Sequence, residues 1–372
     1  MLQAEDGIRD RRSDWSSDVC SSDPEIDRGN AVVNSEDYML SSMMNDVVAE
    51  LRDLVPDNLE LVLDVSPEIP SMMNSDVTKI KRIIKALISN GLKYTEVGGV
   101  YVKLASEKRE YGINLILEVS DTGIGMSSEE LEKGYERYYQ SDSGRTRSAS
   151  GLGLGLGIVY GFVTLLGGFM NISSTPGEGT TVRVSIPQTV VDETPCMAME
   201  NANEISAGLF LETNRFSVPK VREYYNSQAA NVSRGLKITM HRATDVETLK
   251  RVSDDLTHLF VGEEEYKAYS DLMESFAKKM VVVIMAGREF SLPAASNARI
   301  AEKPVYSFTV AKILGTGRLE GKAGNVQMRL DDVTALVVDD EPMNLVVAKS
   351  IFKRYGMKVV TAASGAESVH LC

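Results

Sequence analysis

Residues 121–126 read Asp121-Thr122-Gly123-Ile124-Gly125-Met126 and form the most informative motif of this sequence. The motif follows an alternation of apolar and polar residues from 113 to 119, which predicts a strand with one buried face. A carboxylate at the end of such a strand can accept a hydrogen bond from an exocyclic amine, and glycines let the backbone approach a flat base. We therefore predict that Asp121, Gly123 and Gly125 belong to a nucleotide site. Taken alone, the same residues could form a simple turn.

A second glycine motif, Gly151-Leu152-Gly153-Leu154-Gly155-Leu156-Gly157, precedes an apolar helical pattern over residues 158–165. Glycines before a helix N-terminus leave N–H donors free for phosphate oxygens, so we predict a phosphate lid. Residues 148–177 carry no charged side chain, and a membrane helix needs roughly 20 such residues. Seven glycines between 151 and 168 argue against that alternative, because glycine costs a helix about 1 kcal/mol relative to alanine.

An amphipathic helix is predicted before both motifs. Apolar residues recur at spacings of three and four from Val77 to Ile88, and Asn90 follows two residues later. Because Asn is a poor helix former, we hypothesise that the Asn90 carbonyl oxygen is a Mg²⁺ ligand; the alternative is that Asn90 only frays the helix end. Period-two runs at 59–65 and 182–186 predict two further strands.

These stretches together resemble the catalytic, ATP-binding domain of sensor histidine kinases, of the GHKL or Bergerat type. The resemblance covers residues 34–188 and implies an α/β sandwich, a mixed sheet with helices on one face. The motifs that carry it, in order, are 87–95, 121–126, the aromatic motif 135–140, 151–158 and 174–181. By this resemblance Asn90 ligates Mg²⁺, Lys93 reaches the phosphates, Tyr94 lies in the ATP site, Asp121 holds the adenine amine and Thr180 assists at the base. The glycine lid, formed by Gly151, Leu152, Gly153, Leu154, Gly155 and Leu156, closes over the triphosphate.

The resemblance also implies an activity, with ATP and Mg²⁺ as cofactors. The γ-phosphoryl group passes to a histidine and onward to a receiver aspartate in a phosphorelay, through positioning and electrostatic stabilisation. The family usually has a polar residue four positions before the Mg²⁺ ligand, where this chain has Ala86. We expect transfer to be weakened more than ATP binding. The alternative function is a non-catalytic nucleotide-binding scaffold, and a gyrase-like or chaperone-like ATPase is disfavoured by the missing acidic residue at 86.

The N-terminal residues have a separate explanation. Residues 3–10 and 14–23 resemble the translated constant arms of an indexed sequencing adapter, so residues 1–23 are excluded from fold reasoning as an artefact. Residues 24–33 resemble the end of a dimerisation helix, which implies a homodimer through missing upstream helices. His241, His258 and His370 lack a helical acidic neighbourhood, so we expect them to be structural and the phosphoacceptor histidine to lie outside this chain.

Two segments without periodicity, 189–206 and 315–333, predict linkers. Between them, apolar runs near 207–211, 236–240, 257–261, 280–285 and 305–310 alternate with helical patterns. This alternation predicts a parallel sheet with crossover helices. Residues 207–314 resemble a response-regulator receiver of flavodoxin-like fold without its chemistry. Glu212 and Thr213 stand where the family has paired acids, Gly262 where it has the phosphorylated aspartate, and Ala286 where it has a hydroxyl, so we predict a degenerate receiver used for docking.

Residues 334–372 resemble the opening of an intact receiver. Asp339 and Asp340 are adjacent at the end of a predicted strand, where two carboxylates repel unless they share a cation. We predict a Mg²⁺ site there; the alternative is a solvated acidic loop. The chain stops before a third strand could supply the acceptor aspartate, so we expect this segment to pack poorly on its own.

Composition limits the partners. The 372 residues allow two to three domains, and a net charge of −13 without an aromatic-basic patch argues against nucleic acid. The cysteines do not form a disulfide framework, which suits the cytoplasm. We expect a response regulator or phosphotransfer protein as partner, and membrane attachment only through a missing N-terminal part.

Overall fold

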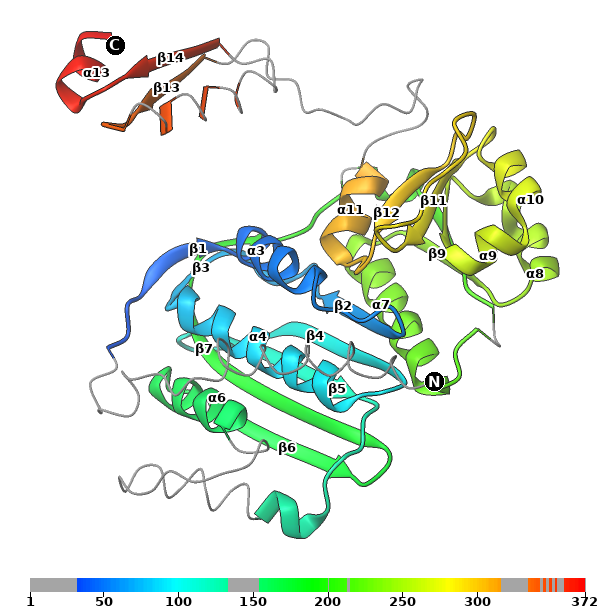
Figure 1. Cartoon of the computed structure of the whole chain (residues 1–372), viewed down its shortest axis with the longest axis horizontal. Helices are drawn as coiled ribbons and strands as arrows, with labels where there is room; N and C mark the ends of the chain where they lie inside the picture. Colours follow the sequence, from blue (N-terminus) through cyan, green and yellow to red (C-terminus); the bar gives the residue numbers. More distant parts are fainter. Residues whose placement is uncertain are drawn as a thin grey trace, which may run out of the picture. The chain divides into compact units, whose positions relative to one another are not determined.

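The structure is a computed structural model that describes residues 32–132, 154–199, 201–212, 215–315, 334–341 and, with gaps, 344–371. Residues 1–23, most of 24–33, the aromatic motif 135–140 and nearly all of the second predicted linker lie outside the described residues. The chain divides into two compact units, Met1–Leu319 and Glu320–Cys372 (Figure 1).

The first unit begins with a sheet of seven strands. Its order is β1-β3-β7-β5-β4-β2, and β6 pairs with the first half of β7, outside this path. Only β2 and β4 are parallel; the other pairs are antiparallel. The strands are β1 (Glu36–Met39), β2 (Leu59–Val65), β3 (Pro70–Ser75), β4 (Gly98–Arg109), β5 (Gly112–Asp121), β6 (Phe169–Thr175) and β7 (Gly179–Pro195). The three strands predicted at 59–65, 113–119 and 182–186 are confirmed.

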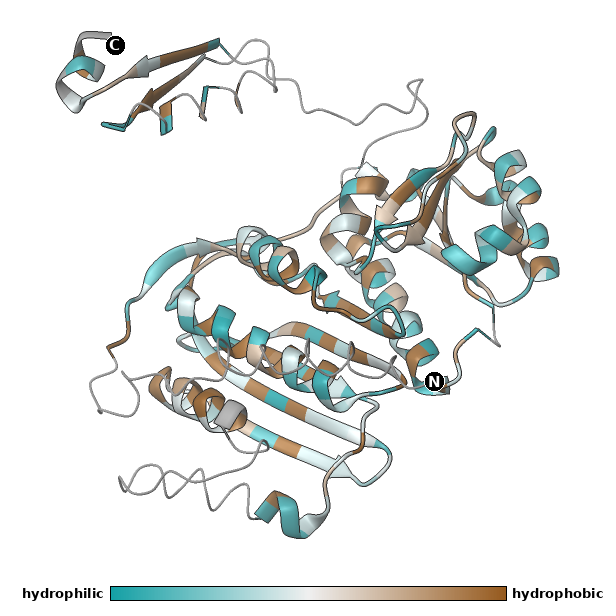
Figure 2. Cartoon of the chain, viewed as in Figure 1, coloured by the Kyte–Doolittle hydropathy of each residue, from teal (hydrophilic) through white to brown (hydrophobic). Residues whose placement is uncertain are grey.

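Three helices, α3 (Leu40–Arg52), α4 (Val77–Tyr94) and α6 (Leu154–Leu165), pack together over one face of this sheet (Figure 1). The apolar stripe of α4 is buried, as its spacing of three and four predicts. Figure 2 shows the matching pattern in the strands, where hydrophobic bands alternate with hydrophilic ones along the chain. A mixed sheet with helices is therefore confirmed.

The chain then forms a second, all-parallel sheet of order β12-β11-β10-β8-β9, the flavodoxin-like arrangement. Helices alternate with its strands, as expected for crossover connections. The strands are β8 (Ser206–Phe210), β9 (Thr239–Ala243), β10 (His258–Gly262), β11 (Val281–Ala286) and β12 (Arg299–Glu302). The helices are α7 (Pro219–Leu236), α8 (Val246–Val252), α9 (Glu263–Ala268), α10 (Ser270–Phe276) and α11 (Ser307–Gly315), with single 3-10 turns at Ala202–Glu204 and Ser253–Asp255.

Two sequence-based expectations need correction. The apolar run 305–310 is not a strand, because the fifth strand is β12 and the run leads into α11, which buries Val310 and Leu314 on one helical stripe. A short apolar run does not distinguish the two by itself. The first predicted linker, 189–206, begins as a strand, because β7 continues to Pro195 and pairs with β3.

Helix α7 lies against the sheet face opposite α4. Glu60 and Asp64 of β2 point toward α7, whereas Leu61 and Leu63 point into the core beneath the helices, in accord with the two-residue period of a strand. Two side chains from this side also form hydrogen bonds with the free backbone edge of β2. Gln228 Nε2 donates to the Leu63 carbonyl (2.7 Å), and the Val65 N–H donates to Ser307 Oγ (3.1 Å). Side chains of the second sheet's helices thus satisfy an edge that would otherwise be unpaired.

The second unit is small. Strand β13 (Thr334–Val338) pairs in parallel with β14 (Lys358–Ala362), and α13 (Gly365–Leu371) follows. Leu336, Val338 and Val360 each remain more than a third exposed. This exposure agrees with the expected lack of a closed core. Across the described part of the chain, no helix has both the length and the apolar character needed to cross a membrane.

Candidate functional site

Asp121 ends β5 and is held by the backbone around it. Its Oδ1 accepts hydrogen bonds from the N–H groups of Gly123 (2.9 Å) and Thr180 (3.1 Å). Its Oδ2 has no hydrogen-bond partner among the described residues. Burial raises the pKa of Asp121, and the two N–H donors and the charge of Lys220 oppose that rise. The carboxyl group therefore has one oxygen anchored by the backbone and one without a recorded hydrogen-bond partner among the described residues.

The glycines around Asp121 allow three backbone segments to meet. A Cβ on Gly123 would lie 2.3 Å from the Tyr94 carbonyl oxygen. Gly125 has a φ of +64°, and a Cβ there would lie 2.0 Å from the Thr175 carbonyl oxygen. The close approach in this structure is thus between backbone segments: the end of α4, the turn after β5 and the β6–β7 hairpin.

Thr180 is joined to Ser174, the first residue of the motif 174–181, to which the sequence analysis gave no role of its own. Ser174 Oγ lies 2.9 Å from Thr180 Oγ1, and it accepts a hydrogen bond from the Met126 N–H (2.7 Å). Ser174 and Thr180 are directly opposite each other in the β6–β7 pair. The signal in the sequence was two hydroxyl residues flanking the turn at Gly177, at equal distance from a hairpin's centre. Ser174 therefore fixes the first glycine motif to the hairpin.

Asn90, Lys93 and Tyr94 come from the last turns of α4, which approaches Asp121 closely. A Cβ on Gly91 would lie 3.6 Å from the Asp121 Cβ. Asn90 is half-buried, and Lys93 is exposed with its Nζ 5.3 Å from the centroid of the Tyr94 ring. Ala86 packs against the core one turn before Asn90 and offers no polar group. The structure thus brings the end of α4 and Asp121 to one place.

Two predicted parts of the site are only partly described. Gly151, Leu152 and Gly153 lie outside the described residues, while α6 begins at Leu154, so Leu154, Gly155 and Leu156 lie in its first turn. The helix predicted after the glycine motif is confirmed. Within the described residues, no group of three or more His, Cys, Asp or Glu side chains could hold a metal. The Mg²⁺ ligand role predicted for Asn90 stays a prediction.

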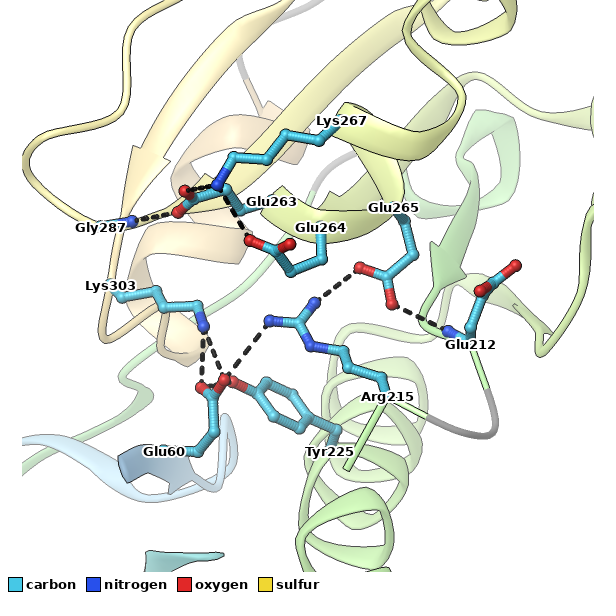
Figure 3. Close-up of polar contacts among 10 residues, drawn as sticks. All are labelled: Glu60, Glu212, Arg215, Tyr225, Glu263, Glu264, Glu265, Lys267, Gly287 and Lys303. Carbon is cyan, nitrogen blue, oxygen red and sulfur yellow. Dashed lines mark hydrogen bonds and ion pairs between the residues drawn. The ribbon is translucent and has the colours of Figure 1, made fainter. Parts of the chain in front are cut away.

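In the flavodoxin-like domain, the space beside Gly262 is filled by the ends of two charged side chains. A Cβ there would lie 1.8 Å from an Arg215 guanidinium nitrogen and 2.0 Å from Glu265 Oε2, so these side-chain ends would have to move. Figure 3 shows Arg215 and Glu265 pointing toward each other. Arg215 and Glu265 form an ion pair of 2.6 Å in that place. Ala286 is buried, the Glu212 N–H donates to Glu265, and Thr213 lies outside the described residues.

Asp339 and Asp340 lie directly after β13 in the second unit. Asp339 Oδ1 accepts hydrogen bonds from the Glu341 N–H (2.9 Å) and Asn344 Nδ2 (3.2 Å), and Asp340 is exposed. The Mg²⁺ site predicted at this pair stays a prediction.

The histidines differ in their surroundings. His258 is buried in β10, and burial lowers its pKa to about 4, so it is neutral at pH 7. Its Nδ1 lies 2.9 Å from Thr257 Oγ1. His241 is half-buried in β9, and the His370 side chain lies outside the described residues. A neutral buried imidazole in a central strand fits the structural role expected for His258.

Residues 75–190 match the family model described as histidine kinase-, DNA gyrase B- and HSP90-like ATPase. This segment is a histidine-kinase-type ATPase domain. It contains Asn90, Asp121 and Thr180, the residues brought together at the end of α4. The glycine lid predicted from the second motif falls within the matched segment too.

Similar proteins indicate which kind of ATPase this segment resembles. The sensor histidine kinase GacS of Pseudomonas protegens is 30% identical over 163 residues, covering 43% of this chain and 18% of its own length. The hybrid signal transduction histidine kinase B of Dictyostelium discoideum is 27% identical over 178 residues, covering 47% of this chain and 9% of its own. Over these residues the chain is similar to sensor histidine kinases, one of them a hybrid kinase, and it spans less than a fifth of the length of these relatives.

A solved structure supports the fold over a longer stretch. Full-length ShkA in complex with AMPPNP superposes with a TM-score of 0.59 at 16% identity, covering 91% of this chain and 70% of that one. At this identity the likeness concerns the fold alone. It extends past the ATPase domain, which agrees with the second, flavodoxin-like sheet described above.

Proposed function

We propose that this chain is the ATP-binding catalytic part of a hybrid histidine kinase that transfers the γ-phosphoryl group of ATP to a histidine and onward to a receiver aspartate. The observation that carries the proposal is the Asp121 carboxyl group, with Oδ1 anchored by two N–H donors and Oδ2 available. An adenine amine is a donor that fits Oδ2, because a carboxylate only accepts hydrogen bonds.

Each remaining residue has a role in this proposal. Asn90 would hold Mg²⁺, Lys93 would reach the phosphates, and the glycine lid would close over them. The metal, when bound, neutralises charge on the β- and γ-phosphates. The protein's own part is positioning, because the γ-phosphoryl group is transferred without covalent chemistry by these side chains. The group would pass to a histidine supplied by the helical domain of the whole kinase, and Gly262 gives the receiver-like domain no acceptor.

The test is ATP binding by the chain with Asp121→Asn. Asn keeps an oxygen for the two N–H donors but replaces Oδ2 with an NH₂ group, which cannot accept from adenine. Losing a hydrogen bond to a charged group costs about 1.5–3 kcal/mol, so we expect the ATP Kd to rise about ten- to hundredfold with the thermal unfolding midpoint unchanged. Titration calorimetry measures the ATP Kd of the parent chain and the variant, and a thermal melt measures the unfolding midpoint of each. Asp192→Asn is the matched control, because Asp192 accepts from the Thr194 N–H on the exposed end of β7. Equal affinity in all three chains would refute the adenine role.

A second candidate function, a nucleotide-binding scaffold without transfer, is favoured by Ala86. One turn before Asn90, a methyl group stands where a polar side chain could assist transfer. An assay can distinguish the two functions. The upstream helical domain is joined to this chain, and transfer of the labelled γ-phosphate from ATP is measured. Transfer that is lost with Asp121→Ala supports the kinase, whereas binding without transfer supports the scaffold. For the chain by itself we expect ATP binding without autophosphorylation, so a labelled band from it alone would contradict this.

A further inference from the structure

A partly buried charge cluster joins the receiver-like domain to the ATPase domain, and Glu60 of β2 is its centre (Figure 3). Glu60 accepts hydrogen bonds from Lys303 Nζ (2.7 and 2.9 Å), Tyr225 Oη (2.7 Å) and Arg215 (3.3 Å). Burial would raise the pKa of Glu60, but the charges of Lys303 and Arg215 hold it below its usual value, so Glu60 is ionised. With the Arg215–Glu265 pair, two carboxylates balance two cations.

Helix α7 is fixed to the same sheet face along its length. The rings of Tyr224 and Tyr101 stack with centroids 4.9 Å apart and planes within 8°. Tyr101 Oη donates to the buried Asp64 (2.6 Å), to which Asn231 of α7 also donates. Gln228 donates to the Leu63 carbonyl, as described above. These contacts require that α7 and the β2–β4 pair keep one relative position.

The first residues of α7 lie behind the turn that carries Asp121. Val218, the residue before α7, has its Cγ2 3.1 Å from where a Cβ on Gly98 would be. Thr122 Oγ1 lies against the same position and accepts a hydrogen bond from the Gly99 N–H (3.0 Å). Thr122 directly follows Asp121, and Lys220 of α7 interacts electrostatically with the Asp121 carboxylate. The helix therefore touches the reverse side of the nucleotide turn.

We propose that the receiver-like domain supports nucleotide binding through α7, with Tyr224 as a positioning residue and Glu60 as the carboxylate that keeps α7 in place. Asp121 presents its free oxygen to the ligand on one side of the sheet, while α7 restrains the Gly98–Gly99 and Thr122 backbone from the other. If α7 withdraws, that backbone gains freedom, and ordering it again lowers nucleotide affinity. This proposal rests on the proposed function.

The test compares paired variants of the full chain for binding of AMPPNP by calorimetry. Glu60→Gln keeps the shape of the side chain but removes its charge, and Tyr224→Ala removes the ring stack. We expect each to raise the AMPPNP Kd about two- to thirtyfold, the range of couplings transmitted through packed elements. Hydrogen exchange should show faster exchange of the 98–101 and 122–125 amides in both variants.

Two controls separate this effect from a general loss of stability. Glu274→Gln alters a carboxylate that accepts from Tyr266 Oη (2.8 Å) and Ser296 Oγ (2.6 Å) wholly inside the receiver-like domain. Tyr224→Phe keeps the stack, and its hydroxyl has no partner to lose among the described residues. Both should bind AMPPNP as the parent chain does. If Glu60→Gln fails to fold, the Tyr224→Ala and Tyr224→Phe pair decides alone.

The outcomes are distinct. A parent chain that does not bind AMPPNP refutes the proposed function. A parent chain that binds, with Glu60→Gln and Tyr224→Ala unchanged in Kd, overturns the role of α7 and leaves the nucleotide site intact. Equal weakening in Glu274→Gln would also overturn it, because the effect would then follow overall stability.

Discussion

At the scale of single residues, the nucleotide turn depends on backbone contacts that larger residues would prevent. Gly125 and Gly179 both have positive φ and both lie within reach of a carbonyl oxygen that a Cβ would strike. Asp121 accepts hydrogen bonds from the Gly123 and Thr180 N–H groups, which these close approaches bring near its carboxylate. The result is a carboxylate whose orientation is set by main-chain atoms, with little dependence on neighbouring side chains.

Gly125→Ala tests this dependence. Its positive φ and the 2.0 Å approach to the Thr175 carbonyl oxygen both oppose a methyl group, so we expect a loss of about 2–4 kcal/mol in unfolding free energy and weaker ATP binding. The matched control is Gly167→Ala, which has a φ of +71° but nothing within 4 Å of its Cβ. Urea denaturation of both variants measures the difference, which should be at least about 1 kcal/mol. Equal losses would mean that backbone strain alone matters.

At the scale of elements, α4 carries Asn90 and Lys93, so its start determines where they lie. Asp76 caps the helix: its Oδ1 accepts from the Lys79 N–H (3.0 Å), and its Oδ2 accepts from Lys79 Nζ (2.6 Å) and the Asn34 N–H (2.9 Å). Asp76 and Lys79 are both buried. Burial would raise the pKa of Asp76, but these hydrogen bonds and the Lys79 charge lower it overall.

The lowered pKa gives a pH-dependent prediction for Asp76→Ala. A carboxyl group whose folded pKa is depressed stabilises the fold above its unfolded pKa and loses that contribution as pH falls through the folded value. At neutral pH we expect the variant to lose about 1–2 kcal/mol or more, and this loss should shrink below about pH 4. Denaturation at several pH values measures it. Asp245→Ala, at the exposed cap of α8, is the control and should lose less. A pH-independent loss would contradict the ion-pair contribution.

Periodicity predicted the elements well where one face is buried and poorly where context decides. The stripe of α4 and the alternation of β2 and β5 could be read directly, because each element buries one face against the other. The run 305–310 could not, since burial of Val310 in a helix and in a strand leaves the same short apolar signature. The extension of β7 to Pro195 was missed because its last residues are largely exposed and show no alternation.

For the candidate site, the sequence predicted the residues but not their supports. Asp121, Asn90 and Thr180 followed from motif spacing. Ser174 and the α7 contacts behind Thr122 did not, because they depend on hairpin register and on the docking of a domain about a hundred residues away. The position of Arg215 beside Gly262 was also not predicted, because an arginine in a loop has no distinctive sequence pattern.

At the scale of the whole molecule, two parallel strand pairs offer an internal comparison of stability. In β10 and β11 every residue is buried, between helices on both sides of their sheet. In β13 and β14 exposed and half-buried residues alternate, and only Ala362 is buried. Both pairs have five paired register positions, so they differ mainly in apolar burial. Burial rather than strand pairing should therefore set their resistance to opening.

Native-state hydrogen exchange of the chain measures that resistance in one experiment. We expect the amides of β13 and β14 to exchange by local opening at least about a hundredfold faster than those of β10 and β11, because each buried apolar side chain contributes about 1.5–3 kcal/mol to holding a strand closed. Adding denaturant should reduce the protection of β10 and β11 while leaving β13 and β14 nearly unchanged, since local openings expose little surface. Comparable protection of the two pairs would show that the second unit has a closed core, against the exposure of Leu336, Val338 and Val360.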